Sequence, residues 1–159
     1  IGKKDVMEVA QKTFISSTNW TERIGPTAAL STIKKMIKNK VPQKLEKTGL
    51  YLIKNLKEIA EKNKIKMEIS GLPALIHLDF QYGAEAQAIK TLFTQEMLKR
   101  GFLATVSVYV SWAHTPEHVK KYLEASDRVF KIIRKALDEK AVEKLLEGPV
   151  AHSGFKRLT

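Results

Sequence analysis

The fold class is decided by one stretch, Lys66-Met-Glu-Ile-Ser-Gly-Leu-Pro-Ala-Leu-Ile-His-Leu-Asp-Phe80, in which the hydrophobic pattern changes from helical to alternating. Residues 66–70 and 74–80 alternate as strands do, and Gly71-Leu-Pro73 between them is typical of a tight turn. A third strand is predicted over 102–110, which is rich in β-branched and aromatic residues. The middle of the chain should therefore form a small sheet of about three strands.

Helical periodicity flanks these strands on both sides. Because one predicted helix separates the hairpin from the third strand, we expect an α+β fold with a mixed or antiparallel sheet and helices on one face. Gly101 is a plausible C-terminal cap, and Thr115-Pro-Glu-His118 is a helix start with a hydroxyl cap and proline at the first position. The predicted helices run over 2–12, from Gly25-Pro26 to a break at Pro42, from there to 62–64, over 84–100, from Thr115 to Leu137, and over 141–146.

Length and composition are those of one globular domain. The chain has 159 residues, of which 43% are hydrophobic and 28% charged. No apolar run approaches the roughly 20 residues that span a bilayer, so we expect no membrane partner. The absence of cysteine removes disulfides and thiolate metal sites and favours a cytoplasmic location. Because the first residue is Ile1 rather than methionine, a fragment or a processed product is expected.

The net charge of +11 is concentrated in the lysines between Lys34 and Lys66, where eleven lysines face only three glutamates. Two interpretations remain open. The lysines can form the solvated side of amphipathic helices, or the Lys34–Lys66 helices can form a basic module that binds nucleic acid or another polyanion. Recognition surfaces tend to use arginine forks or aromatic platforms, and neither is interleaved here, which favours the first interpretation and no nucleic-acid partner.

The histidines do not predict a metal site. His114 and His118 are four residues apart, but Thr115 caps the helix, so His114 lies before it and the two imidazoles do not share a helical face. No cysteine or carboxylate pair completes a ligand set. His77 lies in an apolar strand, where a hydrogen-bonded core histidine is the more common role.

Nucleophilic catalysis is equally unsupported. His152 and Ser153 share the tail, but no orienting acid or oxyanion site can be located for them. Lys3 and Lys4 lie near the chain end, where lysines are usually solvated rather than activated. We therefore predict no catalytic residue in this chain.

A possible anion site is Phe14–Leu30. Its hydroxyls Ser16, Ser17 and Thr18 precede the helix that starts at Gly25-Pro26, where free N–H groups and the helix dipole favour a phosphate. The same hydroxyls can simply cap a helix or finish a strand.

Several segments together resemble the C-terminal part of a class III, pyridoxal-phosphate (PLP) dependent aminotransferase, of the glutamate-1-semialdehyde aminomutase-like branch. None is diagnostic alone, but they occur in register along nearly the whole chain. They are Gly2-Lys-Lys-Asp-Val-Met7, Ser16–Leu30, Thr91–Gly101, Ala113-His-Thr-Pro-Glu-His118 and Gly148–Phe155.

The resemblance implies a domain organisation and a function. Residues 1–40 would be the end of the large domain with the linking helix, and 41–159 the C-terminal small domain of a fold-type I PLP enzyme. The parent enzyme would be a homodimer that moves an amino group between a small-molecule donor and a carbonyl acceptor. Its Schiff-base lysine would lie upstream of Gly2, so this chain alone should be inactive and should not retain PLP.

The resemblance also supplies the site residues. Thr18, supported by Ser17, would bind the cofactor phosphate of the neighbouring subunit. Asn19-Trp20-Thr21 is bulkier than the run expected of the aminomutase proper, which suggests a different amino acceptor, such as a keto sugar.

Overall fold

A computed structural model describes residues 2–13 and 22–154 of the chain. It divides the chain into two compact units, with the boundary between Asn39 and Lys40. No helix in the described ranges is long and apolar enough to cross a membrane.

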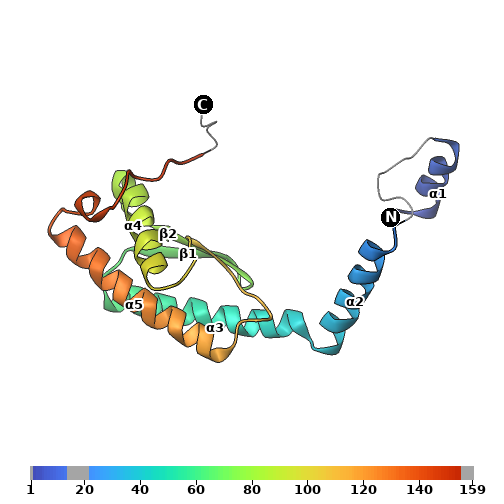
Figure 1. Cartoon of the computed structure of the whole chain (residues 1–159), viewed down its shortest axis with the longest axis horizontal. Helices are drawn as coiled ribbons and strands as arrows, with labels where there is room; N and C mark the ends of the chain where they lie inside the picture. The colour runs from blue at the N-terminus through green and yellow to red at the C-terminus, as the bar shows by residue number, and fades with distance from the viewer. Residues whose placement is uncertain (1, 14–21, 155–159) are drawn as a thin grey trace. The chain divides into compact units, whose positions relative to one another are not determined.

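The first unit contains three helical segments, α1 (Lys4–Met7), the 3-10 helix η1 (Glu8–Lys12) and α2 (Ile24–Lys38) (Figure 1). The single helix predicted over 2–12 is thus one α-helical turn continued by a 3-10 turn. Helix α2 starts two residues before Pro26, which costs no hydrogen bond because the first-turn N–H groups are unpaired anyway. No residue of α2 is buried in the described chain, and its predicted apolar face is exposed, with Ile37 at 73%.

The second unit holds the sheet and the longer helices. Its strands pair in the order β1-β2-β3, both pairs antiparallel, which confirms the predicted α+β fold with a small antiparallel sheet. Its elements are α3 (Val41–Lys62), β1 (Met67–Leu72), β2 (Leu75–Phe80), η2 (Gly83–Glu85), α4 (Ala86–Lys99), β3 (Ser107–Tyr109), α5 (Pro116–Asp138) and η3 (Glu143–Leu145).

The β1–β2 hairpin turns at Pro73-Ala74 rather than at the predicted Gly71-Leu-Pro73. The pairing continues to Leu72 opposite Leu75, so β1 is longer than predicted. Gly71 lies inside the strand with φ of +90°, a conformation that glycine adopts without a steric penalty. Gly71 therefore belongs to β1, where it pairs with Ile76, and not to the turn as predicted.

Strand β3 covers only three of the nine residues predicted as extended. Gly101, with φ of +83°, closes α4 as predicted, and the N–H of Phe102 donates to the Met97 carbonyl in the same cap. The N–H of Ser107 donates to Thr105 Oγ1, which forms a local turn just before the strand. Residues 102–110 therefore form mostly a loop that leads into a short strand, although they are rich in β-branched side chains.

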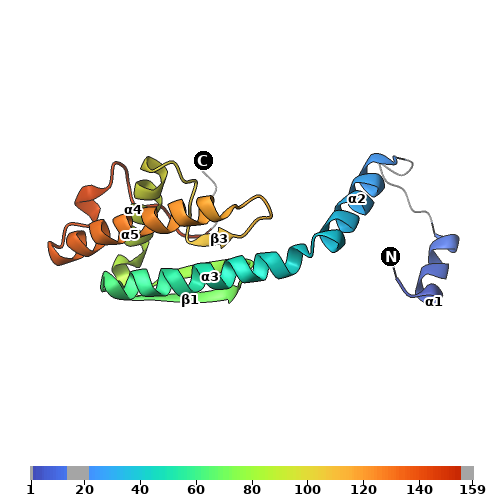
Figure 2. The same ribbon diagram turned by 90° about the horizontal axis from the view of Figure 1, so that it is seen from below.

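The core lies on one face of the sheet. Ile76, Leu78 and Phe80 of β2 are buried there, whereas the alternate residues of the strand are exposed. Helices α3 and α5 run side by side and complete this core with α4 (Figures 1 and 2). The rings of Phe80, Phe93 and Phe130 meet at its centre with centroids 5.8–6.2 Å apart. The predicted inward faces of the three helices are confirmed by the buried residues Leu52, Leu56, Ile89, Leu92, Met97, Val119, Val129 and Ile133.

The end of the described chain differs from the prediction. The α-helix expected over 141–146 is only the 3-10 turn η3. An extended segment follows, whose backbone is hydrogen-bonded to side chains of α4. Helix α5 ends at Asp138, and Lys140, two residues later, has φ of +50° and donates its N–H to the Leu137 carbonyl.

Candidate functional site

The sequence-predicted cofactor residues, Ser17 and Thr18, lie outside the described residues. The described part of the surrounding stretch starts at Glu22 and leads into α2. Within the described ranges, no three histidine, cysteine or acidic side chains are grouped as metal ligands. The structural description of a site therefore rests on the second unit.

A cavity of about 450 Å³ lies between the α4–β3 connection, the start of α5 and the side of α3. Its apolar wall includes Leu52, Phe102, Leu103, Val108 and Val119. Its polar wall includes Thr105, Ser107, His114, His118 and Tyr122. No aspartate, glutamate, lysine or arginine among the described residues lines it, so its walls offer apolar contacts and a few polar atoms.

Both cavity histidines are fixed by backbone N–H groups. The N–H of Ser111 donates to His114 Nδ1 at 3.1 Å, and the N–H of Thr115 donates to His118 Nδ1 at 3.3 Å. Thr115 Oγ1 accepts from the His118 N–H, so Thr115 and His118 form a capping box at the start of α5. The spacing of cap and third residue was visible in the sequence, but histidine is not the usual partner and its role there was missed.

Tyr122 lies under the same cavity wall. Its ring packs edge-on against Phe102 with centroids 5.7 Å apart. Its hydroxyl is the one buried side-chain polar atom without a hydrogen-bond partner in the described ranges. Burial, partly offset by the nearby Ser126 hydroxyl, raises the pKa of Tyr122 to about 12, so the phenol is protonated and can donate.

His77 is not a core residue, and this expectation was wrong. In β2 its neighbours Ile76 and Leu78 point into the core, so His77 points to the opposite, exposed face. Its Nδ1 lies 3.3 Å from Ser107 Oγ on the paired strand. The apolar residues around it suggested burial, but the period of two in a strand places adjacent side chains on opposite faces.

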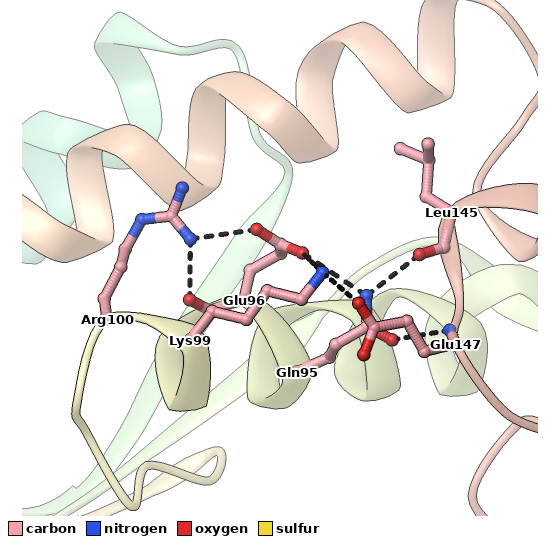
Figure 3. Close-up of polar contacts among 6 residues, drawn as sticks. All are labelled: Gln95, Glu96, Lys99, Arg100, Leu145 and Glu147. Atoms are coloured by element: carbon pink, nitrogen blue, oxygen red, sulfur yellow. Dashed lines mark hydrogen bonds and ion pairs between the residues drawn. The ribbon is translucent and has the colours of Figure 1, made fainter.

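A second polar cluster joins α4 to the extended segment after η3 (Figure 3). Gln95 Nε2 donates to the Leu145 carbonyl at 2.9 Å, and the Glu147 N–H donates to Gln95 Oε1 at 2.8 Å. One turn earlier in α4, Thr91 Oγ1 accepts from the Ala151 N–H. Side chains of α4 thus hold this segment largely by hydrogen bonds to the backbone of the segment.

Glu96 is the buried charge of this cluster. Its carboxylate accepts from Lys99 at 2.8 Å and from Arg100 at 2.9 Å. Burial alone raises the pKa of Glu96, but the hydrogen bonds from the two cations and from Gln95 outweigh it and leave that pKa lowered. Since Lys99 also pairs with Glu147 at 2.8 Å, the carboxylates and cations form one network that links α4 to the segment after η3.

The eleven lysines from Lys34 to Lys66 are all exposed. Some have specific partners, since Lys54 pairs with Glu58 and Lys62 with Asp127. Lys44 Nζ lies 4.0 Å from the centroid of the Trp112 ring, a cation–π contact between α3 and the loop after β3. Their exposure fits both interpretations given to these lysines.

Comparison with known proteins finds a similar protein over most of the chain. The chain is 31% identical over 144 residues to glutamate-1-semialdehyde 2,1-aminomutase of Clostridium kluyveri, a match that covers 78% of this chain. The chain is a relative of this aminomutase. The resemblance predicted from the sequence is thereby confirmed, although the chain spans only about a third (34%) of the length of that relative.

Two solved structures share the fold. An omega-transaminase from Sphaerobacter thermophilus covers 82% of this chain with a TM-score of 0.72 and 16% identity. The FumI protein of Sphingopyxis sp. MTA144, described as a PLP internal aldimine form, covers 87% with a TM-score of 0.74 and 21% identity. In each case the chain covers 34% of the solved structure, so the chain has the fold of one part of such enzymes.

The chain also matches part of a protein of a different kind. The Replication factor C small subunit of Methanococcus vannielii is 32% identical over 91 residues, covering 52% of this chain and 28% of that protein. No protein-family model matches the chain.

The cavity described above does not fit PLP. Its phosphate and aldehyde call for hydroxyl or N–H donors and a lysine. The cavity described above contains no lysine or arginine, and its histidine Nδ1 atoms are already engaged by backbone N–H groups. No catalytic step is therefore derived from the described residues.

Proposed function

We propose that this chain is the C-terminal third of a PLP-dependent aminotransferase or aminomutase. The observation that carries the proposal is the shared coverage. A curated aminomutase and two solved structures each match most of this chain with about a third of their own length. The activity would then belong to the longer protein, and the 159-residue chain alone would not transfer amino groups.

The two units would have different roles in the longer protein. Residues 1–40 would be the end of the large domain and the linking helix, and 41–159 the small domain. Thr18, supported by Ser17, would donate its hydroxyl to the cofactor phosphate of the neighbouring subunit in a homodimer. The bulky Asn19-Trp20-Thr21 that follows would favour an amino acceptor other than glutamate semialdehyde.

A chimaera tests this proposal. The matching C-terminal third of the Clostridium kluyveri aminomutase is replaced by this chain, and PLP binding and amino transfer are measured beside the isolated chain. We expect the chimaera to bind PLP and the isolated chain to show neither binding nor turnover. Turnover by the isolated chain would contradict the proposal, as would a folded chimaera that fails to bind PLP.

The role of Thr18 is tested in the same chimaera. Thr18→Val keeps the shape of the side chain but removes the hydroxyl. We expect PLP affinity to fall about tenfold or more, because hydrogen bonds to charged groups contribute about 1.5–3 kcal/mol. Thr13→Val, which removes an exposed hydroxyl near the end of η1, is the matched control. Equal PLP affinity in the two variants would contradict the assignment.

A polyanion-binding module is the second candidate, and the match to a Replication factor C subunit together with the exposed lysines favours it. Such a module should retain DNA with an affinity that falls steeply as salt increases. An aminotransferase part should bind DNA only weakly. Titration of the chain with duplex DNA at two salt concentrations separates these candidates.

A further inference from the structure

We propose that the cavity between the α4–β3 connection and the start of α5 binds a small carboxylic acid with an apolar body. This inference goes beyond the proposed function. It uses only residues of the second unit, and it holds whether or not the chain is part of an aminotransferase. It rests on the hydrogen-bonding state of the polar wall and on the composition of the apolar wall.

The two histidines of the polar wall can donate hydrogen bonds but cannot accept them, whereas the remaining wall hydroxyls can do either. In a neutral imidazole, one ring nitrogen donates and the other accepts. Because His114 Nδ1 and His118 Nδ1 both accept from backbone N–H groups, each ring offers only its Nε2–H to a ligand. The Tyr122 hydroxyl also lacks a partner among the described residues, but it is buried from solvent, so the donors to a ligand are the two imidazoles. Thr105 Oγ1 is already used by Ser107.

A surplus of donors selects a ligand that supplies acceptors. A carboxylate has two oxygens with about four acceptor positions and no donor, so it can satisfy several N–H and O–H groups at once. An ammonium group presents only donors and would leave the imidazole N–H groups opposed to its own. The polar wall therefore discriminates against amines in two ways. Donor groups of the amine would face donor groups of the wall, and the hydrogen bonds that a carboxylate accepts would be lost.

The apolar wall requires a hydrocarbon body on the same ligand. Leu52 and Val119 are buried at the base of the cavity, and Phe102 and Val108 continue the wall. Leu103 at the rim is 95% exposed, so a bound apolar group would remove its side chain from water. The volume of about 450 Å³ is within the range of ordinary small-molecule sites.

The first test compares two probes with the same body, 3-phenylpropanoate and 3-phenylpropylamine, on the full 159-residue chain. Binding is followed by NMR of a chain carrying ¹⁵N-labelled histidine. We expect the acid to bind with Kd of about 1 mM or tighter and the amine at least about tenfold more weakly. The acid should shift the Nε2 resonances of His114 and His118 while Nδ1 stays unprotonated. No saturable binding of the acid, or equal affinity for acid and amine, would overturn the proposal.

Variants separate a loss of the site from a loss of the fold. Glutamine is a normal capping-box residue, so His118→Gln keeps the cap of α5 but removes the imidazole N–H. We expect this variant to keep the thermal midpoint within about 2 °C, since surface changes usually alter stability little. We expect it to weaken binding of the acid at least about fivefold, because the ligand loses the hydrogen bond from the imidazole N–H.

Two further variants complete the test. Ala104→Phe fills the cavity and should abolish binding of the acid. His152→Gln makes the same change at an exposed histidine outside the cavity and should leave binding unchanged. Unchanged binding in His118→Gln and Ala104→Phe, or an equal loss in His152→Gln, would overturn the proposal.

Discussion

The α-carbon of Gly49 in α3 faces the backbone carbonyl of Pro73 in the β1–β2 turn, with no room between them for a β-carbon. A side chain at Gly49 would collide with three backbone atoms of Pro73. Because these are backbone atoms, no rotamer change can relieve the collision. The close approach fixes the distance between the hairpin and α3.

Replacing Gly49 by alanine should therefore destabilise the chain. Alanine would otherwise favour an interior helical position by about 1 kcal/mol over glycine. We nevertheless expect Gly49→Ala to lower the free energy of unfolding by about 2 kcal/mol, because the backbone of Pro73 has to move. Urea unfolding at constant m measures this change. Gly148→Ala, where the added β-carbon meets no atom within 4 Å, is the matched control and should change stability by less than about 0.5 kcal/mol.

Asp127 of α5 should make stability depend on acid pH. Its carboxylate accepts from Lys131 at 2.8 Å and from Asn63 Nδ2 at 2.8 Å, and Lys62 lies at 3.2 Å. These groups, Lys131 first, lower the pKa of Asp127 from 3.8 to about 2. A lowered folded-state pKa stabilises the folded chain above the unfolded pKa, and this stabilisation is lost as pH falls toward 2. We expect a loss of roughly 2 kcal/mol between about pH 5 and 2 from this residue.

Asp127→Asn isolates that contribution. The variant should be less stable than the parent chain at pH 7, and its unfolding free energy should fall less between pH 5 and 2. Chemical unfolding at several pH values measures both effects. Glu58→Gln removes a side chain that is 59% exposed and pairs with Lys54, and it should leave the acid dependence nearly unchanged. An acid dependence in Asp127→Asn equal to that of the parent chain would show that Asp127 does not cause it.

Gln95 should control the segment after η3. Gln95→Ala removes its hydrogen bonds to Leu145 and Glu147 without opening the apolar core. We expect a loss of about 1–2 kcal/mol in the free energy of unfolding, since these two hydrogen bonds and the longer one of 3.3 Å to Glu96 are lost, each contributing about 1 kcal/mol or less. Amide hydrogen exchange at Glu147 should become fast while exchange in β2 changes only in proportion to stability.

The control for this prediction is Gln81→Ala. Gln81 Nε2 donates only to Asp79, an exposed neighbour on the chain. This variant should leave exchange at Glu147 unchanged. If Gln95→Ala also left that exchange unchanged, the segment would be held by other contacts.

Lys140 offers a stabilising substitution. It has a left-handed backbone at the end of α5, where a non-glycine residue costs roughly 1 kcal/mol. We expect Lys140→Gly to raise the free energy of unfolding by about 0.5–1 kcal/mol, with a higher thermal midpoint. Lys57→Gly, in the interior of α3, is the opposite control and should lower it by about 1 kcal/mol. Lower stability in Lys140→Gly would contradict this account.

The helices of the second unit were predictable because each has a wide apolar face and a recognisable start or end. Thr115 with Pro116, and Gly101 after α4, defined ends that the structure confirms. The length of β3 was not predictable, because the pairing partner rather than the local composition ends it. β2 is paired to β3 only over residues 75–77.

The candidate site was less accessible from sequence. Ser17 and Thr18 remain predictions, since they lie outside the described residues. The cavity could not be predicted, because it brings together residues of three elements separated by up to 70 positions. The spacing of His118 from the Thr115 cap was a signal in the sequence for a capping box. Histidine accepts the hydrogen bond from the cap N–H only when its Nδ1 carries no proton.

The way α4 holds the segment from Leu145 to Ala151 also predicts which positions evolution can vary. Gln95 and Thr91 contact backbone atoms that nearly every amino acid possesses. In a library that varies every position, Glu147 and Ala151 should therefore accept most side chains except proline, which lacks the donating N–H. Gln95 and Thr91 on α4, whose side chains make these hydrogen bonds, should tolerate far fewer substitutions. Divergent relatives can thus keep this attachment while the sequence of the attached segment drifts.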